Sequence, residues 1–512
     1  PGEVDDALTQ RDDTQQAERF IVSIDPSNTH RLAYSFAVTA RGVRADWVHT
    51  DDNEYDRDMS WDPVWIAKAQ LLPDGWSAEM AIPLSQLRLP HVPAASWGID
   101  FNWYIPHRNE DVFWRAVPLD RTAWASYFGA LTELPPVHPG INLELLPYAS
   151  SSLTVDEDPQ GRLARRWRSA FEAGLDFKLR PLPGLTVTAT INPDFGQVEA
   201  DPAFVNLTAY EVTLDEHRPF FVENNALFAD QPLHYFYSRR IGGLPRTLPT
   251  ADELDLPSQV RILGAVAAGG YVAPHTQIAM LAAVTDQATA DAIVDGSKQA
   301  LVVAPLSGWA AGRFEHQLGA SVLGATVTSV ARDLSNTGLE PLLPSSALVA
   351  GADAKLRTPD GTYELDLYGG TSDVNGSAAA IDLLEQSSTP YFQRPDQHYL
   401  HLDTTAHHLL GWHGGVWGEK RAGLWRGYTW FDLESPGLDL NDVGVLQSAD
   451  DISAEAELRR SVTTPTEHVL NWDAYAGAGA YWNYGGTFKP AVLHAGGEMT
   501  RRLRKSLPGV RL

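Results

Sequence analysis

The stretch that decides the fold is residues 192–223, which read N-P-D-F-G-Q-V-E-A-D-P-A-F-V-N-L-T-A-Y-E-V-T-L-D-E-H-R-P-F-F-V-E. The segment F-Y-S-R-R-I-G, residues 236–242, follows it closely. Pro193, Pro202 and Pro219 divide the stretch, and each biases the preceding residue toward an extended backbone. Aromatic residues of the buried type are mixed with acids and arginines, so the stretch is too irregular for one helix or strand. It must fold against a large structure supplied by the rest of the chain.

Long runs of strict two-residue alternation flank this stretch and predict β-strands. In residues 185–192, aliphatic side chains at every second position alternate with threonine and asparagine. Residues 171–180 alternate in the same way, with mainly charged residues on the second face. A Pro-Asp-Gly turn at 359–361 joins two further runs, 352–357 and 362–368, into a predicted hairpin. Similar strands are predicted near 260–270, 275–285, 312–331, 398–408, 423–433, 452–461, 467–480 and 486–502.

The length and pattern of these strands indicate an antiparallel transmembrane β-barrel over residues 139–512. The runs reach about ten residues, as a tilted membrane strand requires, and their charged face suits a water-filled lumen. No run of about 18 apolar residues is present, so a closed barrel is the structure by which this chain could span lipid. A half-buried soluble sheet also alternates, so a soluble β-rich enzyme domain is the competing interpretation. Aromatic residues crowd the late strand ends, as interfacial girdles do: Trp412, Trp417, Trp425, Trp430, Trp472, Tyr481, Trp482 and Tyr484.

Residues 1–138 show a different pattern, in which short β-type runs alternate with turn clusters. Such clusters stand at 26–28, 73–75 and 106–109, each beginning with proline. Several short strands at this spacing predict a β-sandwich. The predicted fold class is therefore all-β, with a sandwich followed by a barrel.

The tract 192–242 resembles, almost word for word, the signature of a family of bacterial outer-membrane β-barrel proteins whose domain has no assigned function. Members of that family carry an N-terminal domain similar to family 9 carbohydrate-binding modules. The resemblance implies a periplasmic N-terminal domain and a chain incomplete at both ends, because strands expected before residue 11 and a terminal aromatic residue are missing. The N-terminal motifs that carry it are R-D-D (11–13), G-W-S-A-E-M-A-I-P (75–83), W-G-I-D-F (97–101) and N-E-D-V-F-W (109–114).

The charge and cysteine content exclude several functions. The chain has 39 Lys plus Arg against 65 Asp plus Glu, a formal net charge of −26, so nucleic acid is not an expected partner. Cations and neutral sugars stay open as ligands. There is no cysteine, which excludes thiol catalysis, cysteine-ligated metals and disulfides. No cofactor is predicted.

Tryptophan is dense in the N-terminal segment, where a flat indole can stack on a sugar ring or fill a core. Trp76, Trp97 and Trp114 lie in apolar alternating motifs, so we expect them in the core. Trp47 and Trp61 flank the acidic loop 51–58 and are the predicted saccharide platforms. That loop could offer oxygen ligands to Ca²⁺, but it lacks the spacing of an EF-hand. We therefore expect a solvated acidic hairpin there and predict no metal site.

Catalytic motifs are missing from the sequence: it contains neither G-x-S-x-G nor H-E-x-x-H. The adjacent His407 and His408 should point to opposite faces of a strand and so cannot share a metal. The remaining dense polar cluster consists of Asp194, Glu199, Asp201, Glu211, Glu216 and Glu223 with Arg218, Arg239 and Arg240. It is either a lumen constriction or ligand site, or a set of buried ion pairs that fix the fold of the tract.

The tract 193–234 is predicted to fold into the barrel. The turn 181–184 is short, as periplasmic turns are, so the strand 185–192 should run outward and deliver the tract at the extracellular end. The predicted function is that of an outer-membrane barrel protein that binds saccharides or other small solutes. A further predicted role is their passage across the membrane. Its expected partners are these solutes and outer-membrane lipid. A glycoside hydrolase and a structural envelope protein are the alternatives.

Overall fold

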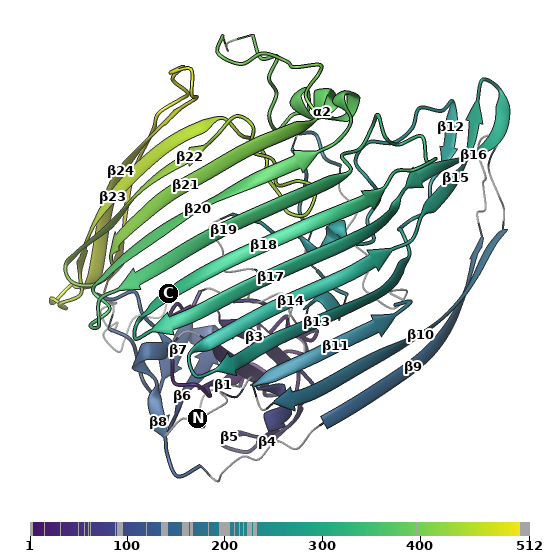
Figure 1. The fold of residues 1–512 in the computed structure, drawn as a ribbon. Helices are drawn as coiled ribbons and strands as arrows, with labels where there is room; N and C mark the ends of the chain where they lie inside the picture. Colours follow the sequence, from purple (N-terminus) through teal and green to yellow (C-terminus); the bar gives the residue numbers. More distant parts are fainter. Residues whose placement is uncertain are drawn as a thin grey trace, which may run out of the picture.

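The structure is a computed structural model whose regular secondary structure is almost entirely β-strand (Figure 1). Its fully described α-helix is α2 (Ala378–Glu385), and residues 220–222 and 228 are helical as well. The described residues are 4–14, 16–30, 32–49, 51–55, 57–59, 61, 63–87, 89, 96–118, 120–134, 142–155, 163, 167–182, 184–193, 205–208, 210–214, 216–218, 220–222, 228, 233–395 and 398–501.

The N-terminal domain consists of two sheets that pack on a shared core. A 6-stranded antiparallel sheet has the order β3-β2-β1-β6-β7, with β8 paired to β6, and a 2-stranded sheet pairs β4 with β5. Phe36 and Trp65 are fully buried in a cluster against which Ala67 of β4 and Met80 of β5 pack, so the two sheets form the predicted sandwich. The strands are β1 (Arg19–Asp25), β2 (Ala33–Thr39), β3 (Arg44–His49), β4 (Ile66–Leu72), β5 (Gly75–Ala81), β6 (Trp97–Ile105), β7 (Glu110–Phe113) and β8 (Gly129–Leu131).

After the N-terminal domain, the main element is a 14-stranded antiparallel sheet whose strands pair in chain order (Figure 1). A 3-stranded sheet, β12-β15-β16, projects from the end away from the N-terminal domain. The strands of the large sheet are β9 (Asn142–Val155), β10 (Trp167–Leu182), β11 (Leu185–Ile191), β13 (Ile262–Ala273), β14 (Thr276–Thr285), β17 (Leu306–Leu318), β18 (Ser321–Asp333), β19 (Ser346–Arg357), β20 (Tyr363–Asn375), β21 (His408–Lys420), β22 (Trp425–Glu434), β23 (Asp451–Val462), β24 (Val469–Trp482) and β25 (Val492–Arg501). Those of the small sheet are β12 (Glu253–Asp255), β15 (Ala288–Val294) and β16 (Ser297–Ala304).

The two faces of the large sheet differ because successive side chains point to opposite sides. In β11, Thr188 and Thr190 are buried on the concave face, whereas Ile191 is exposed on the convex face, which confirms the predicted alternation. Large apolar side chains are exposed along the convex face of the neighbouring strands: Val266, Met280, Val284, Phe314, Leu323, Val327, Leu348, Leu365, Leu367, Leu410, Phe431 and Leu458.

Short and long connections alternate along the large sheet. Those at the end near the N-terminal domain are short, as between Leu318 and Ser321 or between Leu182 and Leu185. Those at the opposite end are long, as between Ile191 and Ile262 or between Asn375 and His408. The long connections, which could fold back over the sheet, therefore all start from the end opposite the N-terminal domain.

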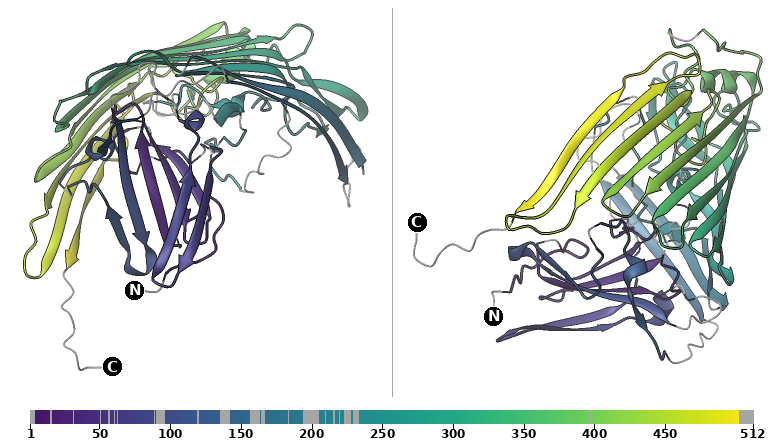
Figure 2. Two further views of the ribbon diagram at one scale, coloured as in Figure 1. Left: turned by 90° about the horizontal axis from the view of Figure 1, so that it is seen from below. Right: turned by 90° about the vertical axis from the view of Figure 1, so that its left-hand side faces the viewer.

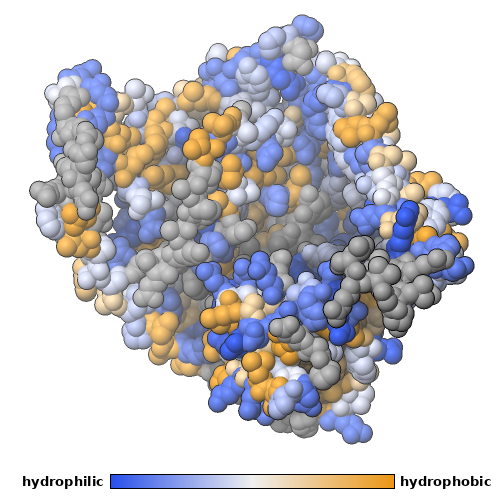
Figure 3. All heavy atoms as spheres, turned by 180° about the vertical axis from the view of Figure 1, so that it is seen from behind, coloured by the Kyte–Doolittle hydropathy of each residue, from blue (hydrophilic) through white to orange (hydrophobic). Residues whose placement is uncertain are grey.

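Two of these long segments fold onto the concave face. Described residues of the tract after β11 enter a core cluster, where Phe221 and Ile241 pack with Ala311 and Val330 of the sheet. The loop 435–450 enters a second cluster that includes Tyr235 and Val349. Seen from behind, this side is hollowed and mixes hydrophilic with hydrophobic residues (Figure 3).

Glycines on the concave face make room for Tyr235. A Cβ added to Gly351 would lie 2.6 Å from the Tyr235 hydroxyl, and one added to Gly370 would lie 3.0 Å from it. The hydroxyl reaches His413 Nε2 on β21 at 2.6 Å. The missing side chains therefore allow the tract to lie directly on the backbone of the sheet.

The large sheet curves into an open arc, and the N-terminal domain lies at one end of it on the concave side (Figure 2). β9 and β25 are its edges, and the described strands show no pairing between them. Asp51 of the N-terminal domain pairs with Lys355 at 3.2 Å and with Arg357 at 3.2 Å, and both partners belong to β19. Thr122 N donates to Arg421 O at 3.0 Å, which ties a second segment to the turn after β21.

Some sequence predictions need correction. Residues 398–407 do not form the predicted strand, because β21 begins at His408; the Asp403 side chain accepts from Thr405 N at 2.9 Å and forms a turn instead. The hairpin β15–β16 was not predicted, although its turn contains Asp295-Gly296, both at positive φ. The predicted boundary between residues 138 and 139 lies outside the described residues.

Candidate functional site

Among the described residues, a cleft on the N-terminal domain offers a candidate site. It has a volume of about 550 Å³ and lies between β1, β5, β6 and the short helix η2 (Pro106–Arg108). Pockets that bind small molecules typically have volumes of about 300–1,000 Å³. The lining residues are Val4, Glu18, Phe20, Asp74, Gly75, Trp76, Ala78, Trp103, Ile105, His107 and Arg108.

Two tryptophans of the cleft are held by one buried carboxylate. Trp76 Nε1 donates to Glu18 Oε1 at 2.8 Å, and Trp103 Nε1 donates to the same oxygen at 3.0 Å. Glu18 is only 3% exposed, so it is shielded from water. Because both indoles are anchored through their only donor, their ring orientation is fixed before any ligand arrives. Trp103 is 41% exposed and presents part of its ring to solvent.

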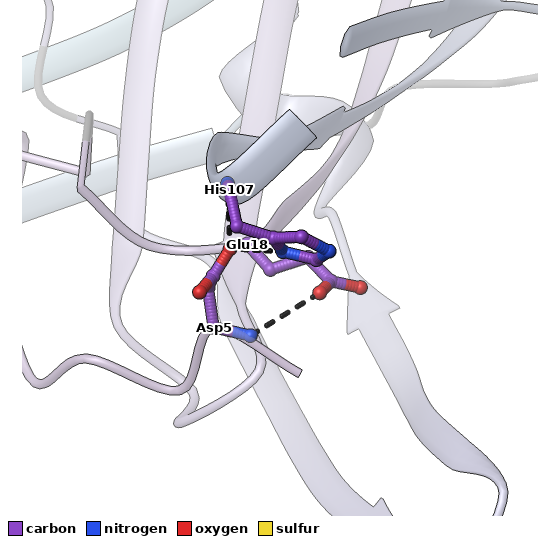
Figure 4. A group of neighbouring side chains, drawn as sticks. All are labelled: Asp5, Glu18 and His107. Atoms are coloured by element: carbon purple, nitrogen blue, oxygen red, sulfur yellow. Dashed lines mark hydrogen bonds and ion pairs between the residues drawn. The ribbon is translucent and has the colours of Figure 1, made fainter. Parts of the chain in front are cut away.

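Asp5 and His107 lie next to Glu18 (Figure 4). His107 N donates to Asp5 Oδ2 at 2.9 Å, and His107 Nδ1 lies 2.6 Å from the same oxygen. The His107 backbone N–H therefore holds the pKa of Asp5 below its usual value. Asp5 N also donates to Glu18 Oε2 at 3.3 Å. One possible metal-ligand atom from each of these three side chains lies within 4.8 Å of the other two. The hydrogen bonds among the three residues account for these short distances.

The cleft combines fixed aromatic surface with exposed polar groups. Phe20 and Trp103 offer apolar surface, and the exposed Asp74 and Arg108 offer an acceptor and donors at its edge. This is the chemistry that binds the apolar face and the hydroxyl groups of a sugar ring. The arrangement suits reversible binding of a polar ligand with an apolar face.

The predicted platforms Trp47 and Trp61 lie elsewhere in the domain. Trp47 is 4% exposed, donates to His49 Nε2 at 2.7 Å and has Arg57 5.0 Å above its ring. Trp61 packs against Tyr34 at a centroid distance of 4.9 Å. Their saccharide role stays a prediction, and at Trp47 it would require Arg57 to move.

Two further expectations for this domain were wrong. Trp114 is 57% exposed rather than in the core, although Trp97 is buried as predicted. The loop 51–58 is not a solvated hairpin, because Asp52 is 6% exposed and accepts from Trp124 N at 2.8 Å and Ser126 N at 2.9 Å. The partner segment lies more than 70 residues away in the sequence, so local pattern could not reveal it.

The predicted polar cluster of the tract is described in part. Asp194, Glu199, Asp201 and Glu223 lie outside the described residues. Of the remaining residues, Glu211 pairs with Arg240 at 2.6 Å, and Arg239 lies in the same short helix, η4 (Ser238–Arg240).

Glu216 and Arg218 form the buried part of this cluster. Arg218 Nη2 donates to Glu216 Oε2 at 2.7 Å, and Ser238 Oγ donates to the same oxygen at 2.5 Å. Arg218 also donates to Ile241 O at 2.7 Å. Burial raises the pKa of Glu216, but hydrogen bonds from Arg218 and Ser238 outweigh burial and leave that pKa below its usual value. These contacts tie the tract to residues 238–241.

The cleft and the inward fold of the loop 435–450 were not predicted from the sequence. Trp76 and Trp103 stand 58 and 85 residues from Glu18, so no local motif links them. The loop carried a signal, because Leu438 and Leu440 alternate with Asp439 and Asn441.

The fold defines a class of protein. It has a large antiparallel β-sheet, loops that pack on the concave face of this sheet, and an N-terminal β-sandwich. Residues 139–500 match the model of the family described as a domain of unknown function (DUF5916), and the chain belongs to this family. Among curated proteins, no sequence match is found. Within the described part of the chain, no helix is long and apolar enough to cross a membrane.

Two solved structures resemble the chain, both with low TM-scores. One is a porin, with 11% identity over 70% of this chain and 99% of the porin chain, and a TM-score of 0.26. The other is Pseudomonas aeruginosa OpdK with vanillate, with 10% identity over 90% of this chain and 82% of the OpdK chain, and a TM-score of 0.26. At these scores neither structure places a site on this chain.

Proposed function

We propose that the chain is an outer-membrane protein whose large sheet spans the bilayer and whose N-terminal domain binds a saccharide. The observation that carries the membrane location is the convex face of the sheet. Large apolar side chains such as Phe314, Val327 and Phe431 are exposed on strand after strand there. Soluble monomers rarely expose a contiguous apolar patch larger than a few hundred Å². Lipid would cover this face favourably.

The concave face supports the same location because it is charged. Arg313 on β17 is 3% exposed and lies 3.0 Å from Glu315 and within hydrogen-bonding distance of Asp353. A membrane barrel carries polar residues inside and apolar residues outside. The distribution of these side chains between the two faces follows that rule.

The connections support an orientation. Outer-membrane barrels have short periplasmic turns and longer extracellular loops. In this chain the short turns lie at the end that contacts the N-terminal domain, as Thr122 does at Arg421. The N-terminal domain is therefore periplasmic in this proposal. Because lipid offers no hydrogen-bond partners, the proposal also requires the edges of β9 and β25 to be paired in the bilayer.

The cleft supports a saccharide as the ligand. Its anchored indoles, Trp76 and Trp103, offer stacking surface, and Asp74 and Arg108 offer hydrogen bonds. The formal net charge of −26 favours neutral or cationic sugars over acidic ones. Passage of the solute through the barrel and glycoside hydrolysis stay predictions.

The membrane location is tested with the full chain. We expect it to fractionate with outer membranes and to migrate faster in SDS gels before heating than after. A monodisperse preparation that is soluble without detergent would refute the location.

The saccharide site is tested by calorimetric titration of the purified full chain with neutral, cationic and acidic oligosaccharides. We expect Trp103→Ala to remove binding. Trp114→Ala is the matched control, because Trp114 is an exposed tryptophan of the same domain that does not line the cleft. Equal loss in both variants, or no binding by the unmodified chain, would contradict the assignment.

A further inference from the structure

An arginine on the convex face lies between two tryptophans. The Arg460 guanidinium carbon is 5.3 Å from the Trp425 ring centroid and 5.8 Å from the Trp472 ring centroid. Arg460 pairs with Trp425 across β22 and β23, and Val462 pairs with Trp472 across β23 and β24. Contact with both rings limits the freedom of the guanidinium while leaving its N–H groups available.

The preceding residue provides a direct comparison. Arg459 points to the concave face, where it lies 3.3 Å from Glu457 and 3.5 Å from Asp473 and stacks on Tyr475 at 4.6 Å. Arg460 is exposed, and among the described residues no carboxylate lies within ion-pair distance of it. One of two adjacent arginines is therefore neutralised within the chain, and the other is not.

The position of Arg460 along the strand indicates the headgroup level of a membrane. It lies two residues before the end of β23, next to the turn at the N-terminal-domain end. Leu458, two residues further into the sheet, is exposed on the same face and begins the apolar surface. Lys420 also lies on this face and donates from Nζ to Trp425 O at 2.6 Å. Aromatic and basic side chains at the edge of an apolar band mark the membrane–water interface.

We propose that Arg460, together with Lys420, binds the phosphate of an anionic lipid headgroup in the periplasmic leaflet. This rests on the proposed membrane location, because the site faces lipid only if the sheet spans the bilayer. A guanidinium donates two parallel hydrogen bonds to phosphate oxygens, and the two rings hold it in the plane where headgroups lie. The open, apolar surroundings suit a headgroup whose acyl chains continue over Leu458, rather than a free anion.

The test compares Arg460→Gln with Arg459→Gln, which removes the same charge from the opposite face of the same strand. The full chain is purified in detergent micelles, and the bound lipids are measured by native mass spectrometry during titration with phosphatidylglycerol. We expect about fivefold weaker binding in Arg460→Gln and unchanged binding in Arg459→Gln. Diacylglycerol, which has the acyl chains without phosphate, should not bind at this site in any of the three proteins.

The outcomes distinguish a failure of the proposed membrane location from a failure of the proposed lipid site. A protein that does not enter micelles or vesicles refutes the membrane location. An inserted Arg460→Gln variant that binds phosphatidylglycerol as tightly as the unmodified chain, or an Arg459→Gln variant that loses as much binding as Arg460→Gln, overturns the lipid site. Displacement of the lipid by millimolar inorganic phosphate would show a free-anion site and overturn the lipid assignment.

Discussion

Replacement of Glu216 by glutamine should loosen the tract from the concave face without unfolding the sheet. The Glu216 side chain is 4% exposed and that of its partner Arg218 is 14% exposed. The substitution keeps the size of the side chain but removes the charge that Arg218 and Ser238 bind. Arg218 then stays buried without the charge of Glu216 beside it.

The magnitude follows from the burial of this pair. Removing one partner of a buried ion pair costs about 3–5 kcal/mol. Arg218 keeps two carbonyl acceptors, Ser238 O at 2.8 Å and Ile241 O at 2.7 Å, so we take the lower end of that range. A loss of about 3 kcal/mol corresponds to a roughly 150-fold larger open fraction of the tract.

Hydrogen exchange measured by mass spectrometry in detergent micelles checks this value. We expect the peptide 233–242 to exchange roughly 150-fold faster in Glu216→Gln, while peptides from β17 and β18 keep their rates. Because the folded-state pKa of Glu216 is depressed, its stabilisation is present above its unfolded pKa of about 4.3 and is lost as pH falls through the lower folded value. The difference between the two proteins should therefore shrink below about pH 4.

Glu211→Gln is the matched control. Glu211 also pairs with an arginine of η4, but its side chain is 30% exposed, so its loss should cost about 1 kcal/mol or less. Equal acceleration of exchange in the two variants would refute the argument from burial. Exchange in β17 that rises together with that of the tract would show that the tract and the sheet unfold as one unit.

The remaining predictions concern the sheet, a buried acid and the domain junction. Val187→Arg should destabilise the reconstituted protein by about 2–4 kcal/mol in urea titrations if Val187 lies near the bilayer midplane, and an unchanged midpoint would contradict a lipid contact. Burial, followed by Asp442, raises the pKa of Asp439 to about 6, so the charged form weakens the fold as pH rises from about 4 to above 6. Asp439→Asn should accordingly gain about 3 kcal/mol at pH 8 and almost nothing at pH 4 in urea titrations, and a pH-independent difference would refute this. Asp51→Asn leaves the buried Arg357 with fewer acceptors, so exchange of the segment 120–127 should accelerate while β19 stays protected; unchanged exchange would mean that Asp51 does not hold the junction.

The sheet could be predicted from the sequence where alternation and turn chemistry agree. The run 185–192 and the short turn before it match β11 and its connection to β10. Residues 398–407 alternate too, but Asp403 and Thr405 close a turn there, and local hydrogen bonds prevail over pattern. Alternation alone therefore predicts too many strand residues wherever an aspartate side chain can accept a hydrogen bond from the backbone N–H two residues ahead.

The sites could be predicted only where partners are close in sequence. Glu216 and Arg218 are two residues apart, and their pairing follows from a local turn. Trp76 of β5 and Trp103 of β6 meet Glu18, the residue before β1, only because the two sheets of the domain pack together. The prediction that Trp114 lies in the core was wrong because its side chain is exposed. An alternating apolar motif does not show which part of a strand faces solvent.

The junction between the two domains also sets an order of assembly. Asp51 meets Arg357 across 306 residues of chain, and Asp52 meets Arg421 across 369. The strands of the large sheet, by contrast, pair with sequence neighbours, so they can form step by step. The N-terminal domain is synthesised first, yet its seat exists only after β19 and the turn following β21 have folded. Docking of this domain therefore reports that the sheet has been completed at least as far as β21, and a variant stalled before that point would leave the domain folded but undocked.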